Sequence, residues 1–142
     1  MLPVGNGQAL AVTFTPADTT NYGNATAGVV INVLPAPSPA TLIMTQTLAR
    51  DGGTNEVVVT LTLANTGGLP ATGVQVTSAK IGTTSSTTAI PAAVADVPAG
   101  GSSSVVLRFP GSVGAAGTRP VLAITGVYSG GSFGGSSRLI LP

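Results

Sequence analysis

Few side chains in this sequence are able to act as catalytic groups or metal ligands. The 142 residues include no His and no Cys, and they carry four acidic residues against five Lys and Arg. Imidazole is the commonest general base, and imidazole and thiolate are the usual ligands of zinc. The composition therefore predicts neither a histidine- or cysteine-dependent enzyme nor a transition-metal site, and we expect no cofactor.

The closest pair of acidic residues, Asp51 and Glu56, flanks the turn Gly52-Gly53. Two carboxylates and nearby backbone carbonyls can hold Ca²⁺ at the start of a strand. A calcium site needs several oxygen ligands, and no third acidic residue lies nearby in the sequence. We therefore interpret Asp51 and Glu56 as solvated turn charges and predict no metal site.

Lys80 admits two reactive interpretations. It could activate a Ser as the base of a Ser–Lys dyad, or it could join Asn65 beside Glu56 in an intramolecular isopeptide bond. The residue types alone favour these chemistries, and no buried acid is evident near Lys80. We therefore predict a surface lysine.

A glycine-rich stretch, Gly130–Gly135, resembles a phosphate-binding loop in composition. Such loops stand before a helix N-terminus, whereas the residues that follow here have a strand pattern. We expect a flexible hairpin loop capped by Phe133. Asn24-Ala25-Thr26 matches a glycosylation sequon, a short pattern that often arises by chance. We predict no active site and no enzymatic activity.

The charge distribution excludes one class of partner. Only 6% of residues are charged, against roughly a quarter in soluble domains, and the net charge is +1. These charges are scattered, so no basic patch is available to displace counterions from a nucleic acid. Low charge also removes repulsion between copies of the chain, which favours self-association.

Localisation signals are sparse. The first residues do not form a signal peptide, so we expect any export signal to lie upstream or to have been removed. The longest apolar stretch, Val29–Leu34, is too short to span a bilayer and contains Asn32, so we expect no membrane insertion. Absence of Cys is compatible with a bacterial secreted protein.

Gly and Pro punctuate a sequence rich in β-branched residues, and helix signals are almost absent. This pattern favours an all-β sandwich. Apolar and polar residues alternate most clearly over 56–64. We expect strands over 10–15, 27–33, 41–48, 56–64, 74–81, 103–109, 121–128 and 138–141, and a polar edge strand or loop over 83–88.

Three prolines on alternate positions make 35–40 an extended linker. Six or seven strands over 41–142 match an immunoglobulin-like Greek-key sandwich. Residues 1–34 supply only two or three strands, and a lone hairpin is marginal in water. We therefore expect these strands to pack on the second domain, on a missing first half, or on another chain.

Two family resemblances agree with this organisation. Leu10–Tyr22 and Ala25–Val33 resemble the last strands of bacterial Ig-like repeats, in which Asp18 and Tyr22 have the spacing of a tyrosine corner. Residues 41–142 resemble CARDB-like and fibronectin-type-III-like adhesion modules of secreted bacterial proteins. That second resemblance is carried by Val57–Gly67, Ala71–Val76, Pro98–Ser102 with Val105–Phe109, and Gly126–Ser136. Both imply an extracellular or cell-surface protein without catalytic residues.

Three functions remain open. The first is a structural or adhesive module that assembles into a surface fibre, with the strands of 1–34 completing a sandwich edge in a neighbouring copy. The second is a passive spacer of a tandem array. The third is a carbohydrate-binding accessory module. Against the third, the chain has no Trp, and several of its five aromatic residues belong to the expected core: Phe14, Tyr22, Phe109, Tyr128 and Phe133.

Overall fold

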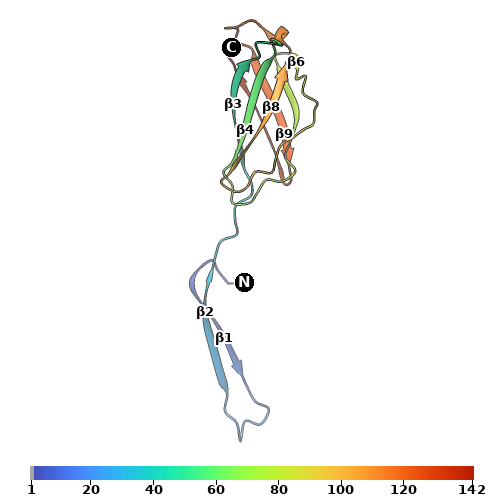
Figure 1. Ribbon diagram of the computed structural model, residues 1–142. Coiled ribbons are helices and arrows are strands. Elements are labelled where there is room, and N and C mark those ends of the chain that lie inside the picture. The colour runs from blue at the N-terminus through green and yellow to red at the C-terminus, as the bar shows by residue number, and fades with distance from the viewer. Residues whose placement is uncertain (1) are drawn as a thin grey trace. The chain divides into compact units, whose positions relative to one another are not determined.

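The computed structural model describes residues 2–142 and consists almost entirely of antiparallel strands (Figure 1). It divides into two compact units, of which the first ends at Ala36 and the second begins at Pro37. The division therefore falls inside the proline-rich segment. Within the described residues, no helix is long and apolar enough to cross a membrane.

The first unit is a two-stranded hairpin of β1 (Gly5–Phe14) and β2 (Ala25–Val33). In the connecting turn the Asp18 carboxylate accepts hydrogen bonds from the backbone N–H groups of Thr20 and Asn21 at 3.1 and 3.2 Å. Tyr22 contacts Asp18 through the backbone, at 3.2 Å, and its side chain is exposed. The described residues therefore do not form the tyrosine corner that the resemblance implied.

The second unit is a sandwich of two sheets. One sheet has the strand order β3-β4-β8, and the other has the order β10-β9-β5-β6 with β7 paired to β5. The bounds are β3 (Leu42–Arg50), β4 (Val57–Asn65), β5 (Gln75–Ile81), β6 (Thr84–Ser85), β7 (Ala92–Ala93), β8 (Ser102–Phe109), β9 (Val121–Tyr128) and β10 (Gly131–Arg138), with the 3₁₀ turn η1 (Gly111–Val113) before β9. The chain crosses between sheets after β4, β7 and β8, so the predicted immunoglobulin-like all-β sandwich is confirmed.

The core lies between the two sheets. In β4 the alternate residues Val57, Val59, Leu61 and Leu63 are fully buried, while the residues between them are half-buried. Side chains of a strand point alternately to opposite faces, so one apolar face of β4 packs on the facing sheet. That sheet supplies Val76, Ile81, Leu122, Ile124 and Phe133.

The C-terminal part corrects two predictions. The glycine-rich residues are not a flexible loop, because Gly131–Arg138 forms β10 and pairs with β9 along its whole length. Phe133 is buried in the core rather than capping a turn, and Gly126 opposite it has no side chain to block the ring. The expected strand over 138–141 is also absent after Arg138, although Leu139 and Leu141 are buried.

Candidate functional site

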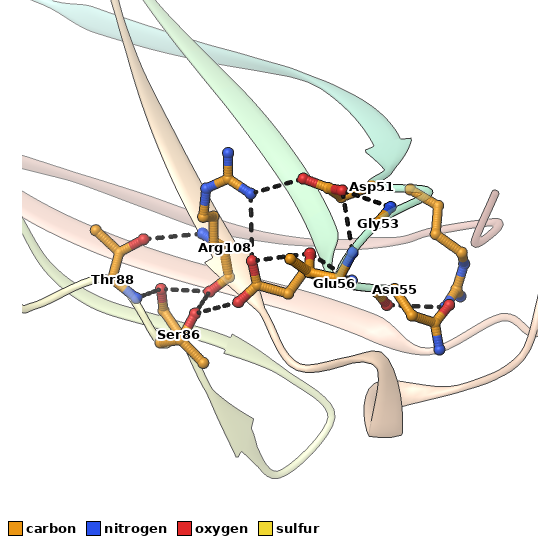
Figure 2. Close-up of polar contacts among 10 residues, drawn as sticks. Asp51, Gly53, Asn55, Glu56, Ser86, Thr88 and Arg108 are labelled. Carbon is orange, nitrogen blue, oxygen red and sulfur yellow. Dashed lines mark hydrogen bonds and ion pairs between the residues drawn. The ribbon is translucent and has the colours of Figure 1, made fainter.

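Asp51 and Glu56, the pair considered for calcium, lie at one end of the sandwich around Arg108 (Figure 2). The Arg108 Nη1 atom lies 3.3 Å from Asp51 Oδ2 and 3.2 Å from Glu56 Oε2. Arg108 comes from β8, whose pairing with β4 places Arg108 opposite Val58, two residues beyond Glu56. A guanidinium thus occupies the position between the two carboxylates in which a cation would have to sit.

The turn before β4 fixes both carboxylates. Asp51 Oδ1 accepts hydrogen bonds from the N–H groups of Gly53 and Thr54 at 2.9 and 3.2 Å. Asn55 has a positive φ of 58°, a conformation that asparagine tolerates better than most residues. Glu56 Oε1 also accepts a bond from Thr87 Oγ1, outside the turn, at 3.3 Å. The local sequence therefore builds a hydrogen-bonded turn.

The electrostatics of this cluster are those of an ion pair. The two turn N–H groups and the Arg108 guanidinium hold the pKa of Asp51 below its usual range. Hydrogen bonds to Asp51 and Glu56 raise the pKa of Arg108. A proton donor or acceptor at neutral pH would need the opposite shifts. No group of three or more acidic, His or Cys residues suited to a metal occurs in the described part of the chain.

Of the two reactive interpretations of Lys80, the isopeptide bond receives no geometric support, while Ser85 of β6 is the residue paired directly opposite Lys80. Asn65 is the last residue of β4 and Glu56 precedes its first residue, so a nine-residue strand of roughly 30 Å separates them. The Asn65 amide nitrogen already donates to the carbonyls of Leu69 and Val97 at 2.8 and 3.2 Å. Lys80 itself is an exposed residue of β5, as predicted. Glu56 is therefore too far away to assist an isopeptide bond at Asn65.

Asn65 instead closes the opposite end of the sandwich. It is a buried polar residue, 2% exposed. Its Oδ1 atom accepts hydrogen bonds from the N–H groups of Thr41 and Gly67 at 3.1 and 3.0 Å. The sequence indicated only a turn at Asn65, because a turn asparagine and a buried, four-bonded asparagine look alike without the strands around them.

The aromatic residues do not form a sugar-binding platform on the sandwich. Phe109 and Phe133 are buried, and Tyr128 is half-buried with its hydroxyl donating to the Ala40 carbonyl at 3.0 Å. Phe14 and Tyr22 are 65% and 67% exposed, and both belong to the hairpin unit. Tyr128 and Phe133, the aromatic residues nearest the glycine-rich stretch, therefore serve packing.

One face of the hairpin is apolar and exposed. Cross-strand neighbours share a face, so Leu10, Val12 and Phe14 of β1 lie with Val29, Ala27 and Ala25 of β2. The large members are 42–65% exposed. A hollow of about 280 Å³ lies between the cross-strand pairs Leu10–Val29 and Val12–Ala27. No acidic or basic residue occurs in either strand.

The sandwich has a smaller cleft at the side where its two sheets end in β3 and β10. Met44 and Gln46 of β3 and the 135–137 segment of β10 form its rim, and Leu61, Leu122 and Ile124 form its base. Its volume is about 150 Å³. Gln46 Nε2 donates to Ser137 Oγ across the cleft at 2.8 Å.

No protein-family model matches the chain, and no curated protein or solved structure is significantly similar to it. The class is defined by the fold alone: the chain is an all-β, immunoglobulin-like sandwich joined to a β-hairpin.

Proposed function

We propose that this chain is a non-catalytic, extracellular structural or adhesive module of a bacterial surface protein, which self-assembles through its hairpin strands. One observation carries the proposal: Leu10, Val12 and Phe14 of β1 are 42–65% exposed on an uncharged strand. Exposed apolar patches of this kind mark interaction surfaces. A bare two-stranded ribbon is also marginal in water, so these strands gain stability from a partner.

The acceptor in this proposal is the β10 edge of a second copy. β10 ends its sheet, and its residues before Arg138 are Gly, Ser and one buried Phe. Proteins usually protect an exposed edge with Lys, Pro or a bulge, and this edge has neither charge nor Pro until Arg138. It is therefore suited to β-strand addition.

The cleft beside β10 suits the side chains of the donor strand. A strand added to the β10 edge would project every second residue toward the apolar base of the cleft, formed by Leu61, Leu122 and Ile124. The alternating series Leu10, Val12 and Phe14 has that spacing. Because donor and acceptor are different surfaces, the contact is heterologous, and it produces a fibre where successive copies do not close into a ring.

We further propose that the sandwich is a CARDB-like or fibronectin-type-III-like adhesion module, and two of its features support this. The motif Asn65-Thr66-Gly67 lies at the turn where β4 ends, and Pro98–Gly101 leads directly into β8. The β3-β4-β8 sheet faces β10-β9-β5-β6, an arrangement that such modules would require. A spacer in a tandem array is the second candidate, favoured by a closed core that needs no added strand.

Analytical ultracentrifugation and negative-stain electron microscopy of the full chain test the assembly. We expect concentration-dependent oligomers, and filaments at high concentration. Val12→Asp places a charge on the apolar face and should raise the concentration for half-assembly at least about tenfold, which corresponds to about 1.4 kcal/mol. Ser136→Lys should weaken assembly through the acceptor edge.

Thr13→Asp is the matched control, because Thr13 lies on the same strand with its side chain on the opposite face. It should leave assembly close to that of the wild type. A wild-type chain that stays monomeric at all concentrations would exclude the fibre and leave the spacer. Equal effects of Val12→Asp and Thr13→Asp on assembly would show that the apolar face does not drive it.

A further inference from the structure

The chain enters and leaves the sandwich at opposite ends (Figure 1). At the entry, Leu42 of β3 pairs with Asn65, the last residue of β4. At the other end of β3, the Arg50 Nε atom donates to the Pro142 carbonyl at 2.8 Å. β3 has nine residues, so roughly 30 Å of strand separates the two ends. β10 runs in the same direction, from Gly131 beside Tyr128 to Arg138.

We propose that the sandwich is built to transmit tension between these two ends, independently of whether the hairpin assembles. A pull on the entry draws β3 lengthwise in one direction, and a pull on the exit draws β10 in the other. Each strand is bonded along its whole length, with nine Cα pairs between β3 and β4 and eight between β10 and β9. These ladders are loaded in shear, so their hydrogen bonds resist together rather than one after another.

The entry is anchored before β3 begins. The Ser38 carbonyl accepts from the Gly68 N–H at 3.0 Å, and the Ala40 carbonyl accepts from the Tyr128 hydroxyl at 3.0 Å. Thr41 N donates to Asn65 Oδ1 at 3.1 Å. These bonds join the incoming segment to both sheets, because Asn65 belongs to β4 and Tyr128 to β9. Tension is therefore divided between the two sheets at the point of entry.

The exit is anchored after β10 ends. Leu139 and Leu141 are 3% and 2% exposed, and the N–H of Leu141 donates to the Thr118 carbonyl at 3.0 Å. Arg50 also holds the loop beneath the exit, since its Nη2 atom donates to the Gly114 carbonyl at 2.8 Å. The buried side chains of Leu139 and Leu141 and the Arg50 guanidinium therefore hold residues 139–142 on the sandwich.

The two terminal strands are connected directly at the cleft between the sheets. Gln46 of β3 donates to Ser137 of β10 at 2.8 Å. Because tension displaces these strands in opposite directions, this bond crosses the plane of slip. It is a single hydrogen bond, and β3 and β10 cannot slide past each other until it breaks.

Single-molecule pulling on the full chain tests the proposal. The sequence has no Cys, so two introduced cysteines define the points of attachment without competition. Ala36→Cys with Pro142→Cys loads the strands in shear. Ala36→Cys with Ala99→Cys pulls at one end only, since Ala99 lies beside Gly100, whose N–H donates to the Asn65 carbonyl. We expect the shear geometry to unfold at a force at least about twofold higher, because the other geometry breaks its ladder pair by pair. Equal forces, or a lower force in shear, would overturn the proposal.

Gln46→Ala sharpens the test. Loss of a hydrogen bond worth about 1 kcal/mol should speed unfolding in shear about fivefold at a fixed force. In the one-ended geometry the same variant should unfold at the wild-type rate. Gln75→Ala, the same change at an exposed site on β5, is the control and should leave both geometries unchanged. An equal effect of Gln46→Ala in both geometries would mean that the bond stabilises the fold without lying on the path of tension. The hairpin lies outside both attachment pairs, so these results do not depend on the proposed assembly.

Discussion

β1 of the hairpin and β4 of the sandwich have the same alternating sequence pattern, and their side chains end in opposite environments. In β4, Val57, Val59 and Leu61 are fully buried. In β1, Leu10 and Val12 are 42% and 65% exposed. The difference is a facing sheet, which β4 has and β1 lacks within its own unit. Alternation therefore specifies a strand and its apolar face, but it does not specify what covers that face.

The turns of the two regions differ in the same way. Asp18 in the hairpin and Asp51 in the sandwich each accept two backbone N–H bonds from the residues that follow. Both carboxyl pKa values are lowered, and for Asp18 the largest cause is the side chain of Asn21. Asp51 additionally pairs with Arg108 from a strand far away in the sequence. The local turn chemistry is shared, while the long-range partner of Asp51 comes from β8, which pairs with β4 in the same sheet.

The largest expected effect concerns Asn65, whose side chain joins four backbone groups at one end of the sandwich. Asn65→Ala leaves two N–H groups and two carbonyls without their side-chain partner. We expect a loss of about 3 kcal/mol or more in the free energy of unfolding, because four partly or fully buried hydrogen bonds, each worth about 1 kcal/mol, are lost together. Urea unfolding followed by circular dichroism measures it.

The matched change in the hairpin is Asn32→Ala, which removes one exposed bond to the Gly7 N–H. It should leave the urea midpoint of the sandwich unchanged. If Asn65→Ala also left the urea midpoint unchanged, the side-chain bonds of Asn65 would not be needed to stabilise its end of the sandwich.

The second prediction compares one substitution in the two apolar faces. Leu61→Ala empties a fully buried position and should destabilise the sandwich by about 3–4 kcal/mol. Leu10→Ala removes the same atoms from a side chain that is 42% exposed and should change the sandwich by less than about 0.5 kcal/mol. Both are measured by urea unfolding at a concentration at which the chain is monomeric. A similar loss in both variants would mean that the hairpin face is buried in the monomer.

The smallest expected effect concerns pH. The native-state pKa of Asp51 lies below that of the unfolded chain. Its contribution to stability is therefore complete above about pH 4 and is lost as the pH falls through the lowered native pKa. Asp51→Asn should flatten this part of the pH profile of the urea midpoint. Asp18→Asn should not alter the midpoint of the sandwich, because Asp18 lies in the other unit. An unchanged profile in Asp51→Asn would show that the charge of Asp51, held by the Gly53 and Thr54 N–H groups and by Arg108, adds nothing to folding.

Much of the sandwich could be predicted from the sequence because its strands carry period-two patterns between turn residues. The strand predicted over 121–128 matches β9 in full, and that over 56–64 matches β4 to within one residue. The prediction of a flexible loop over Gly130–Gly135 was wrong, because glycine and serine have low strand propensity and Gly131–Arg138 nevertheless forms β10. That segment becomes a strand because it pairs along all of β9 and inserts Phe133 into the core.

The sequence alone determined the chemistry that this protein lacks, because absent imidazole and thiol groups cannot be supplied by folding. It also determined the all-β class and the positions of most turns, which follow from local patterning. Only the tertiary structure decided which residues meet: Arg108 with Asp51 and Glu56, Asn65 with Thr41, and Gln46 with Ser137. These pairs are separated by up to 91 residues, and their proximity follows from strand order and register rather than from local sequence.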